Sequence, residues 1–385
     1  MILIWIRCSV TVSIPFTPPH VSVNRVRIID LPGLPVDDEV RGQMAYHLLS
    51  GLAVTHYARE QAEALQLPVA FSQDTTQTRL ELPRFVDGCL SSPHESVRAA
   101  ARAIGQRLGR NLGYILLTLH RGDAVNQAAR PDWTAEDWEH WAKIERVWLG
   151  GGLMSGALGE LIVQSARDCL AGYGYAGQLR VESSPYGEMM AVLGAARYLP
   201  ASTRVALCLD FGQTTIKRAG LEFEDGVMVR VRRFESLVGD VDELPTTATP
   251  GPDTGRKVLD MMTGAIAQTL DEAVACGITL DADLMLSVAS YVRGGQLLSS
   301  GGLYASLDAL ADDVRPLLAD AVFAQTGRAL RVHLIHDGTA ACTLYAGVPN
   351  AAVIVVGTAL GIGFPPADAR GLRPLAPNLM TRRDG

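Results

Sequence analysis

Apolar residues recur along the chain at two spacings, and each spacing predicts a type of secondary structure. Between Val97 and Leu112 they fall three or four positions apart, which is the period of an amphipathic helix. Thr134 and Asp137 resemble a capping box, with Asp in place of the usual Glu or Gln, and predict a helix start. The helices expected before the first strand cover residues 36–64, 93–121 and 134–143.

From Arg146 onward, short apolar runs alternate with helical patterns. The runs expected to be strands are 146–149, 177–182, 204–210, 216–223, 227–233, 283–289, 331–335 and 351–356. The helices expected between them are 155–170, 187–198, 257–276, 305–327 and 339–346, and the polar stretch 236–256 is expected to be a loop. Strands that alternate with helices in this way predict an α/β protein.

Composition narrows the class of protein. A chain of 385 residues favours two domains, and a 48% share of hydrophobic residues supplies a sizeable core and excludes wholesale disorder. The formal charge of −7 argues against a nucleic-acid-binding surface. The six cysteines and eight histidines are dispersed, so we expect neither a disulfide framework nor a zinc site.

The N-terminal segment has two interpretations. Residues 1–6 are apolar, but Arg7 follows directly and the run is too short to span a bilayer. Residues 8–20 look like a short strand and a proline-rich linker, and we treat residues 1–19 as an extension. The extension is either an edge strand or upstream sequence included by a misplaced start codon, and the sequence favours neither. Because no other stretch resembles an export or membrane signal, a cytoplasmic protein is expected.

The segment from Leu207 to Lys217, LCLDFGQTTIK, combines an apolar strand, a tight turn and a return strand. The strand delivers Asp210, and the turn contains Gly212. Backbone N–H groups and hydroxyls at such a hairpin tip can cradle phosphate oxygens, and a nearby carboxylate can hold hydrated Mg²⁺. The alternative is an ordinary glycine hairpin, because the D-x-G-x-T-x-x-K spacing is only moderately specific.

A second glycine-rich turn follows the buried strand of residues 352–356. The strand breaks at Gly357 and Thr358, and Gly361 and Gly363 come soon after. This spacing also suits close approach of the backbone to phosphate, with the Thr358 hydroxyl as a donor. The alternative is a glycine-rich hairpin within a core.

A third glycine turn, Gly150–Gly152, lies between a strand and a helix in residues 147–153, VWLGGGL. Glycines at this place let an adenosine lie against the backbone. A plain βα turn explains the same residues nearly as well.

Asp337 stands between a buried strand and a helix that is expected to start near Thr339. A carboxylate just before a helix N-terminus is favoured in its ionised form, so it can accept a proton from a substrate hydroxyl. The alternative is that Asp337 only caps the helix.

Together these four segments resemble the ATP site of the sugar kinase, Hsp70 and actin superfamily, and within it the chain resembles the ROK family of bacterial sugar kinases and repressors. Residues 97–121 and 145–199 look like the family's C-terminal third, and residues 204–363 look like its N-terminal portion. In the family the Asp210-type hairpin opens the chain, whereas here it follows the triple glycine. The order resembles a circular permutation with the old termini joined near residues 199–204.

The resemblance implies a two-domain, circularly permuted actin-like ATPase (ribonuclease H-like) fold with mixed sheets. Residues 203–347 would form the domain with the first phosphate turn and the catalytic aspartate. Residues 20–200 and 348–385 would form the domain with the adenosine site and the second phosphate turn. ATP and Mg²⁺ would bind in the cleft between the two, and a homodimer is the family's usual assembly.

The resemblance also implies transfer of the ATP γ-phosphoryl group to a hydroxyl of a sugar or polyol. Asp337 would be the general base, and Asp210 would orient Mg²⁺ through water. Lys217 would either meet phosphate or point to solvent. The expected nucleotide contacts are Gly212, Gln213, Thr214, Thr215, Lys217, Gly357, Thr358, Gly361, Gly151 and Gly152, and the expected acceptor contacts are Ser290, Tyr304 and His336.

The chain departs from the family where the substrate is recognised. After Gly363 it continues FPPAD, without the G-x-x-G-x-x-G-E-x-G-H stretch that supplies sugar-binding Glu and His, and the family's cysteine-rich zinc motif is absent. His336 replaces the Asn that usually precedes the catalytic Asp. The alternative function is therefore a nucleotide-binding regulator or sensor, derived from a sugar kinase, that transfers no phosphate to a small molecule.

Overall fold

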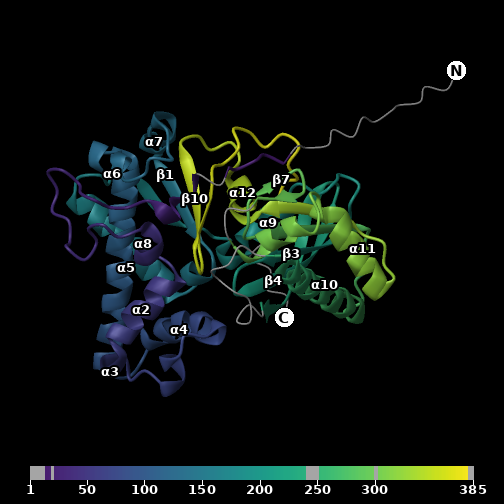
Figure 1. Cartoon of the computed structure of the whole chain (residues 1–385), viewed down its shortest axis with the longest axis horizontal. Coiled ribbons are helices and arrows are strands. Elements are labelled where there is room, and N and C mark those ends of the chain that lie inside the picture. Colours follow the sequence, from purple (N-terminus) through teal and green to yellow (C-terminus); the bar gives the residue numbers. More distant parts are fainter. Residues whose placement is uncertain (1–13, 19–20, 240–250, 299–301, 380–385) are drawn as a thin grey trace.

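The computed structural model of the chain describes residues 14–18, 21–239, 251–298 and 302–379. It is a mixed α/β protein with two main sheets, so the predicted α/β class is confirmed. Figure 1 shows two lobes side by side, each built around one of these sheets. The predicted extension of residues 1–19 lies outside the described residues except for 14–18.

The sheet of the first lobe has four strands in the order β11-β10-β1-β2: β1 (Arg146–Gly150), β2 (Arg180–Ser183), β10 (Ala351–Val356) and β11 (Leu360–Gly363). The strands β10, β1 and β2 are parallel, and β11 is antiparallel to β10. The register places Trp148 opposite Val353, so the sheet joins segments about 200 residues apart in the sequence.

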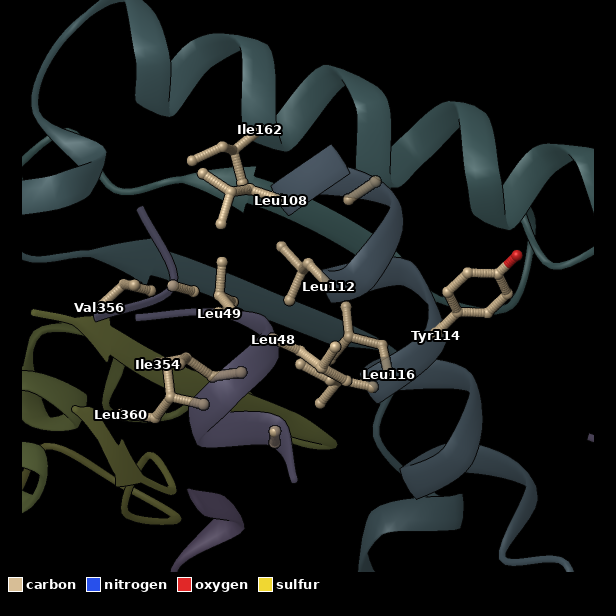
Figure 2. Packing of buried hydrophobic residues seen from close by; sticks show 14 of the residues in the cluster. Leu48, Leu49, Leu108, Leu112, Tyr114, Leu116, Ile162, Ile354, Val356 and Leu360 are labelled. Carbon is tan, nitrogen blue, oxygen red and sulfur yellow. The ribbon is translucent and has the colours of Figure 1, made fainter. Parts of the chain in front are cut away.

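Helices form one core with the outer face of this sheet, some of them packing on other helices of the lobe. They are α1 (Ala45–Leu48), α2 (Gly51–Glu60), α3 (Ala62–Leu65), α4 (Thr76–Cys89), α5 (Glu95–Arg121), α6 (Ala124–Ala128), α7 (Ala135–Ala142) and α8 (Ala157–Gly172). Figure 2 shows Leu108 and Leu112 of α5 between Ile162 of α8 and the Leu48–Leu49 pair. The long helix α5 is thus the centre of the first core, because its apolar positions recur with the helical period.

The second lobe contains a five-stranded sheet in the order β5-β4-β3-β6-β9: β3 (Val205–Phe211), β4 (Thr215–Glu224), β5 (Val227–Val238), β6 (Asp283–Val288) and β9 (Arg331–His336). The first three strands form antiparallel hairpins, and β6 and β9 run parallel to β3. The helices α10 (Pro252–Ala275) and α11 (Val314–Thr326) cover one face. A small hairpin of β7 (Val292–Arg293) and β8 (Gln296–Leu297) follows β6.

The helices α9 (Met190–Ala196) and α12 (Asp337–Cys342) lie between the two sheets. Leu193 of α9 packs with residues of the five-stranded sheet, whereas Met190 packs with Trp148 of the four-stranded sheet. The two helices approach each other closely, since a Cβ at Gly194 would lie 1.9 Å from the carbonyl oxygen of Ala340. Asp337 follows the end of β9 and begins α12. Because α12 belongs to this central layer, Asp337 lies at the boundary between the lobes.

The segment after β11 leaves the first lobe. Leu372 and Leu379 pack with the α9 side of the five-stranded sheet, and Leu375 forms an isolated bridge with Met228 of β5. The sequence-based boundaries placed all of residues 348–385 in the other domain. The described residues after β11 instead pack against the second lobe, because their apolar side chains lie there.

Arg373 holds this segment against the turn at 200–204, which links the two lobes. Its guanidinium donates hydrogen bonds to the carbonyl oxygens of Pro200, Thr203 and Gly226, at 2.8, 2.7 and 3.0 Å. In return the Nε of Arg197 donates to the carbonyl oxygen of Arg373 at 2.8 Å. Both arginines are buried. Arg373 gives the carbonyl of Thr203 its donor and adds a second donor to the carbonyl of Pro200, which also accepts from the N–H of Thr203 at 3.0 Å.

Several predicted elements differ from the structure, and three of them show the physical reasons. The helix expected over 36–64 begins only at Ala45, because residues 36–43 form turns in which Val36 and Val40 are buried. The helix expected over 305–327 divides into a 3₁₀ helix, Leu303–Ala309, and α11, whose start is capped by Asp313. The loop expected over 236–256 is shorter at both ends, and its residues 240–250 lie outside the described part.

Further 3₁₀ turns connect these elements. They are η2 (Val23–Arg25), η3 (Val69–Ser72), η4 (Gly152–Met154), η5 (Gly187–Met189) and η7 (Thr343–Tyr345).

Replacing Gly363 by Ala is expected to lower the free energy of unfolding by about 1–3 kcal/mol. A Cβ at this position would lie 2.0 Å from the carbonyl oxygen of Gly338, so β11 and α12 would have to separate. The measurement is the urea midpoint at constant m-value. As a control, Gly264→Ala on α10 adds a methyl group with no atom within 4 Å and is expected to stabilise the chain slightly. Equal midpoints for the two variants would contradict the prediction.

Candidate active site

A cleft of about 910 Å³ opens between the two lobes, and residues from both sheets line it. Fourteen of the fifteen predicted site residues line this one cleft, and Tyr304 is the exception. They are Asp210, Gly212, Gln213, Thr214, Thr215, Lys217, Gly357, Thr358, Gly361, Gly151, Gly152, Ser290, Asp337 and His336. Segments that are distant in the sequence therefore share one surface.

Asp210 and Lys217 form a buried ion pair at the start of the β3–β4 hairpin. The two residues are register partners, and the Nζ of Lys217 donates to Oδ2 of Asp210 at 2.9 Å. The hydroxyl of Ser287 donates to the other carboxyl oxygen at 2.9 Å. Burial opposes the charge of Lys217, but the Asp210 carboxylate outweighs it, so the pKa of Lys217 is raised. The side chain of Lys217 therefore does not point to solvent, which was one of the two sequence-based interpretations.

The turn between β3 and β4 presents backbone groups to the cleft. The Gly212 N–H donates to the carbonyl oxygen of Thr215 at 3.0 Å, and a Cβ at Gly212 would lie 2.9 Å from the same oxygen. A side chain at this position would therefore disturb the tight turn. The backbone N–H groups of Gln213 and Thr214 donate to no other group in the described part of the chain. They are free to bind an anion.

The turn between β10 and β11 faces the first turn across the cleft. The hydroxyls of Thr214 and Thr358 are 3.3 Å apart, although the two turns connect strands of different sheets. As in the first turn, the N–H groups of Thr358 and Ala359 donate to no other group among the described residues. The carbonyl oxygen of Gly357 accepts a hydrogen bond from the N–H of Gly51 at 2.7 Å, which anchors the turn to α2.

The triple-glycine turn packs directly against the end of β10. Gly151 has a φ of +97°, which favours glycine, and a Cβ there would lie 2.5 Å from the carbonyl oxygen of Val356. By contrast, a Cβ at Gly152 would meet no atom within 4 Å, so this residue faces open space in the cleft. The turn thus lies beside the Gly357–Thr358 turn.

Asp337 is the first residue of α12, and its two carboxyl oxygens have different surroundings. Oδ1 accepts a hydrogen bond from the N–H of Gly338 at 2.6 Å, and Nε2 of His336 lies 3.1 Å from the same oxygen. Oδ2 accepts no hydrogen bond in the described part of the chain. Burial and the nearby charge of Asp210 raise the pKa of Asp337 to about 7, against the lowering effects of the Gly338 N–H and Lys217. The group can therefore gain and lose a proton near neutral pH.

The predicted acceptor contacts lie at different depths. Ser290 is buried beside the cleft, and its Oγ has no hydrogen-bond partner among the described residues. A buried hydroxyl without a partner is costly, so a ligand group would satisfy it. Tyr304 is fully buried and does not line the cleft. Its hydroxyl donates to the carbonyl oxygen of Gly212 at 2.7 Å, so it supports the first turn and is not placed to contact an acceptor, contrary to the prediction.

Several residues of the cleft were not found by sequence reasoning. Asn24 forms two hydrogen bonds with the backbone of Leu360, at 2.8 and 2.9 Å, and so fixes the start of β11. Asp87 accepts a hydrogen bond from the N–H of Leu158 at 2.7 Å, beside the triple-glycine turn. The capping residue Thr75 signals the helix that carries Asp87, but Pro83 inside that helix obscures the helical pattern. Asn24 has no local signal, because its partner is 336 positions away.

In the described ranges, no three His, Cys, Asp or Glu residues come together in a way that could hold a metal ion. Both carboxyl oxygens of Asp210 already accept hydrogen bonds, so this residue suits a contact to Mg²⁺ through water better than direct coordination. No described helix is long and apolar enough to cross a membrane.

No protein-family model matches the chain, and no curated protein matches it.

Proposed function

We propose that the chain is an ATP-dependent kinase that transfers the γ-phosphoryl group to a hydroxyl of a sugar or polyol. The observation that carries the proposal is the pair of opposed turns, whose Thr214 and Thr358 hydroxyls lie 3.3 Å apart. Their free N–H groups and hydroxyls, next to a buried carboxylate, are the donors that polyphosphate needs. Asp337 supplies a proton acceptor in the same cleft.

The spatial arrangement of the segments supports the permuted actin-like fold. The triple-glycine turn precedes the Asp210 hairpin in the sequence, yet both line one cleft. The junction proposed near residues 199–204 is a short surface turn between α9 and β3, where natural termini would be close together. A permutation at this point would leave both sheets and the cleft unchanged.

In this proposal each residue has one task. The turns at Gly212–Thr214 and Gly357–Thr358 bind the phosphates, and the turn at Gly151–Gly152 holds the adenosine. Asp210 holds Mg²⁺ through water, and the ion when bound neutralises charge on the transferring group. Asp337 takes the proton of the acceptor hydroxyl, and the oxygen of that hydroxyl bonds to the γ-phosphorus. The bond from that phosphorus to the bridging oxygen breaks, and ADP leaves.

One observation favours the second candidate, a nucleotide-binding regulator or sensor without phosphotransfer. The described residues after Gly361 do not line the cleft, and Phe364 instead packs against His140 and Trp141. The segment that carries sugar contacts in the resembled family thus contributes nothing here. In this case the chain would bind ATP·Mg²⁺ and leave small molecules unchanged.

Thermal unfolding with ATP·Mg²⁺ tests the proposal, followed by the same assay with a panel of sugars and polyols. A ligand at a hundredfold excess over its Kd should raise stability by about 2.7 kcal/mol. A kinase should show a nucleotide shift that one acceptor increases, with ADP as a product. Ser290→Ala serves as the matched variant, and should keep the nucleotide shift and lose the acceptor's part. A nucleotide shift without any acceptor effect or ADP supports the regulator, and no shift contradicts both functions.

A further inference from the structure

Asp87 of α4 caps a helix other than its own. The helix α8 begins after the triple-glycine turn, and its N-cap is Gly156, which has no side chain to accept a hydrogen bond. Oδ1 of Asp87 instead accepts a hydrogen bond from the N–H of Leu158, in the first turn of α8, at 2.7 Å. A carboxylate at this place satisfies a backbone donor and interacts favourably with the positive end of the helix dipole.

The backbone at Gly156 makes room for the carboxyl group of Asp87. The three atoms nearest to a Cβ at Gly156 would be Oδ1, Cγ and Oδ2 of Asp87, at 2.5 to 2.7 Å. A side chain at position 156 would therefore displace the carboxyl group. Gly156 has φ −126° and ψ −167°, which is the extended conformation usual for a serine N-cap. A serine could thus cap α8 locally, so capping alone does not require Asp87.

Capping uses one oxygen of Asp87 and leaves the other for a ligand. Oδ2 accepts no hydrogen bond in the described part of the chain. Asp87 lines the same cleft as Gly151 and Gly152. Its charge would repel phosphate oxygens, whereas the two opposed turns offer them donors. The part of ATP that suits Asp87 is therefore uncharged and carries hydrogen-bond donors.

The order of elements along the cleft indicates which part of ATP this is. The triple-glycine turn lies beside the Gly357–Thr358 turn, since a Cβ at Gly151 would lie 2.5 Å from the carbonyl oxygen of Val356. Asp87 comes next, because it covers the N-cap of the helix that follows the triple glycine. In ATP the ribose likewise comes directly after the phosphates, and its hydroxyls are hydrogen-bond donors.

From this arrangement we infer that Asp87 is a specificity-determining residue, whose Oδ2 accepts a hydrogen bond from a ribose hydroxyl of the nucleotide. The inference rests on the proposed kinase function, which puts the nucleoside at the triple-glycine turn. Leu80 and Pro83 of the same helix also line the cleft, and their apolar groups suit the face of a base. The cleft therefore selects ribonucleotides over deoxyribonucleotides, because a missing hydroxyl leaves the carboxylate without its donor.

The test is the affinity of the full chain for four nucleotides with Mg²⁺, measured by calorimetry. They are ATP, 2′-deoxyATP, 3′-deoxyATP and inosine triphosphate, which keeps the ribose and replaces the amino group of adenine by an oxygen. The wild-type chain should bind one or both deoxynucleotides about 10- to 100-fold more weakly than ATP, the usual effect of losing a hydrogen bond to a charged group. Asp87→Ala should bind ATP and both deoxynucleotides within about threefold of one another.

A second variant separates nucleotide recognition from capping. Asp87→Ala also removes the cap of α8, so it should unfold at a lower temperature than the wild type. In the double variant Asp87→Ala, Gly156→Ser, the serine hydroxyl can cap α8 in the space that the carboxyl group leaves. The double variant should recover the thermal stability and not the preference for ATP. Recovery of both would show that Asp87 acts only as a cap, and would overturn the inference.

The other outcomes distinguish this inference from the proposed function. Equal wild-type affinities for ATP and both deoxynucleotides would overturn the role of Asp87 and leave the kinase function standing. If Asp87→Ala weakens the binding of ATP but not that of inosine triphosphate, Asp87 contacts the amino group of the base, and the ribose role is overturned. A wild-type chain that binds none of the four nucleotides would contradict the kinase function together with this inference.

Discussion

Replacing Asp337 by Asn is expected to lower phosphoryl transfer by about 10²–10⁴-fold, the usual contribution of a positioned general base. Asn keeps an oxygen that can accept from the Gly338 N–H in place of Oδ1, but it puts an amide where Oδ2 would accept the proton. The phosphate turns are unchanged, so ATP binding should stay within a few-fold of wild type. The measurements are single-turnover transfer and ATP affinity by calorimetry. Equal loss of both would remove Asp337 from the role of base.

The pH profile provides a second measurement of the same residue. Burial and the charge of Asp210 raise the pKa of Asp337 to about 7, while Lys217 acts in the opposite direction and His336 stays neutral. The base must be ionised, so kcat/KM for the acceptor should rise with pH through about 7 and fall below it. The residual activity of Asp337→Asn should not follow this rise. A wild-type rate that is flat between pH 5 and 9 would contradict the assignment.

Replacing Lys217 by Met is expected to lower the free energy of unfolding by about 3–5 kcal/mol, because one charge of a buried ion pair loses its partner. The carboxylate of Asp210 would then have only the hydroxyl of Ser287 in a buried environment. Met has a similar length and fills the same space, so packing changes little. Chemical unfolding measured by circular dichroism gives the difference.

Two further variants show whether the loss comes from the charge. The double variant Asp210→Asn, Lys217→Met has no unpaired charge and should recover much of the stability. Lys143→Met removes an exposed lysine from its pair with Glu139 and should cost less than about 1 kcal/mol. If Lys217→Met unfolds as readily as Lys143→Met and no more, the buried pair does not stabilise the fold.

The elements that sequence patterns predict well are those whose signal is local. The helix over 93–121 and the strand over 351–356 match the structure within about two residues. A long run of residues with the helical period defines the helix, and a short apolar run defines the strand. The helix over 36–64 is wrong at its start for a different reason. Val36 and Val40 are buried at helical spacing, but Gly42, with a φ of +74°, belongs to a turn that the spacing of apolar residues does not reveal.

The same distinction applies to the site. The glycine turns could be found from the sequence because strand, turn and hydroxyl residues follow one another within a few positions. The sequence could not show which of these turns lie together in the fold, because Thr214 and Thr358 are in contact across 144 positions. Tyr304 was misplaced for this reason, because its polar end satisfies a carbonyl beneath the turn and does not face the cleft. Its burial depends on packing that no local pattern records.

The contacts of Arg373 also set an order of events during synthesis. During translation Pro200 is added to the chain 173 positions before Arg373, whose guanidinium donates to the carbonyl oxygen of Pro200. At bacterial to eukaryotic elongation rates this interval lasts about 10 to 35 s on the ribosome. Throughout that time the carbonyl of Pro200 has only the N–H of Thr203 and water as donors, and the carbonyl of Thr203 lacks the Arg373 donor. The two lobes can begin to fold as they emerge, but these contacts between the turn and Arg373 form only after residue 373 has been made.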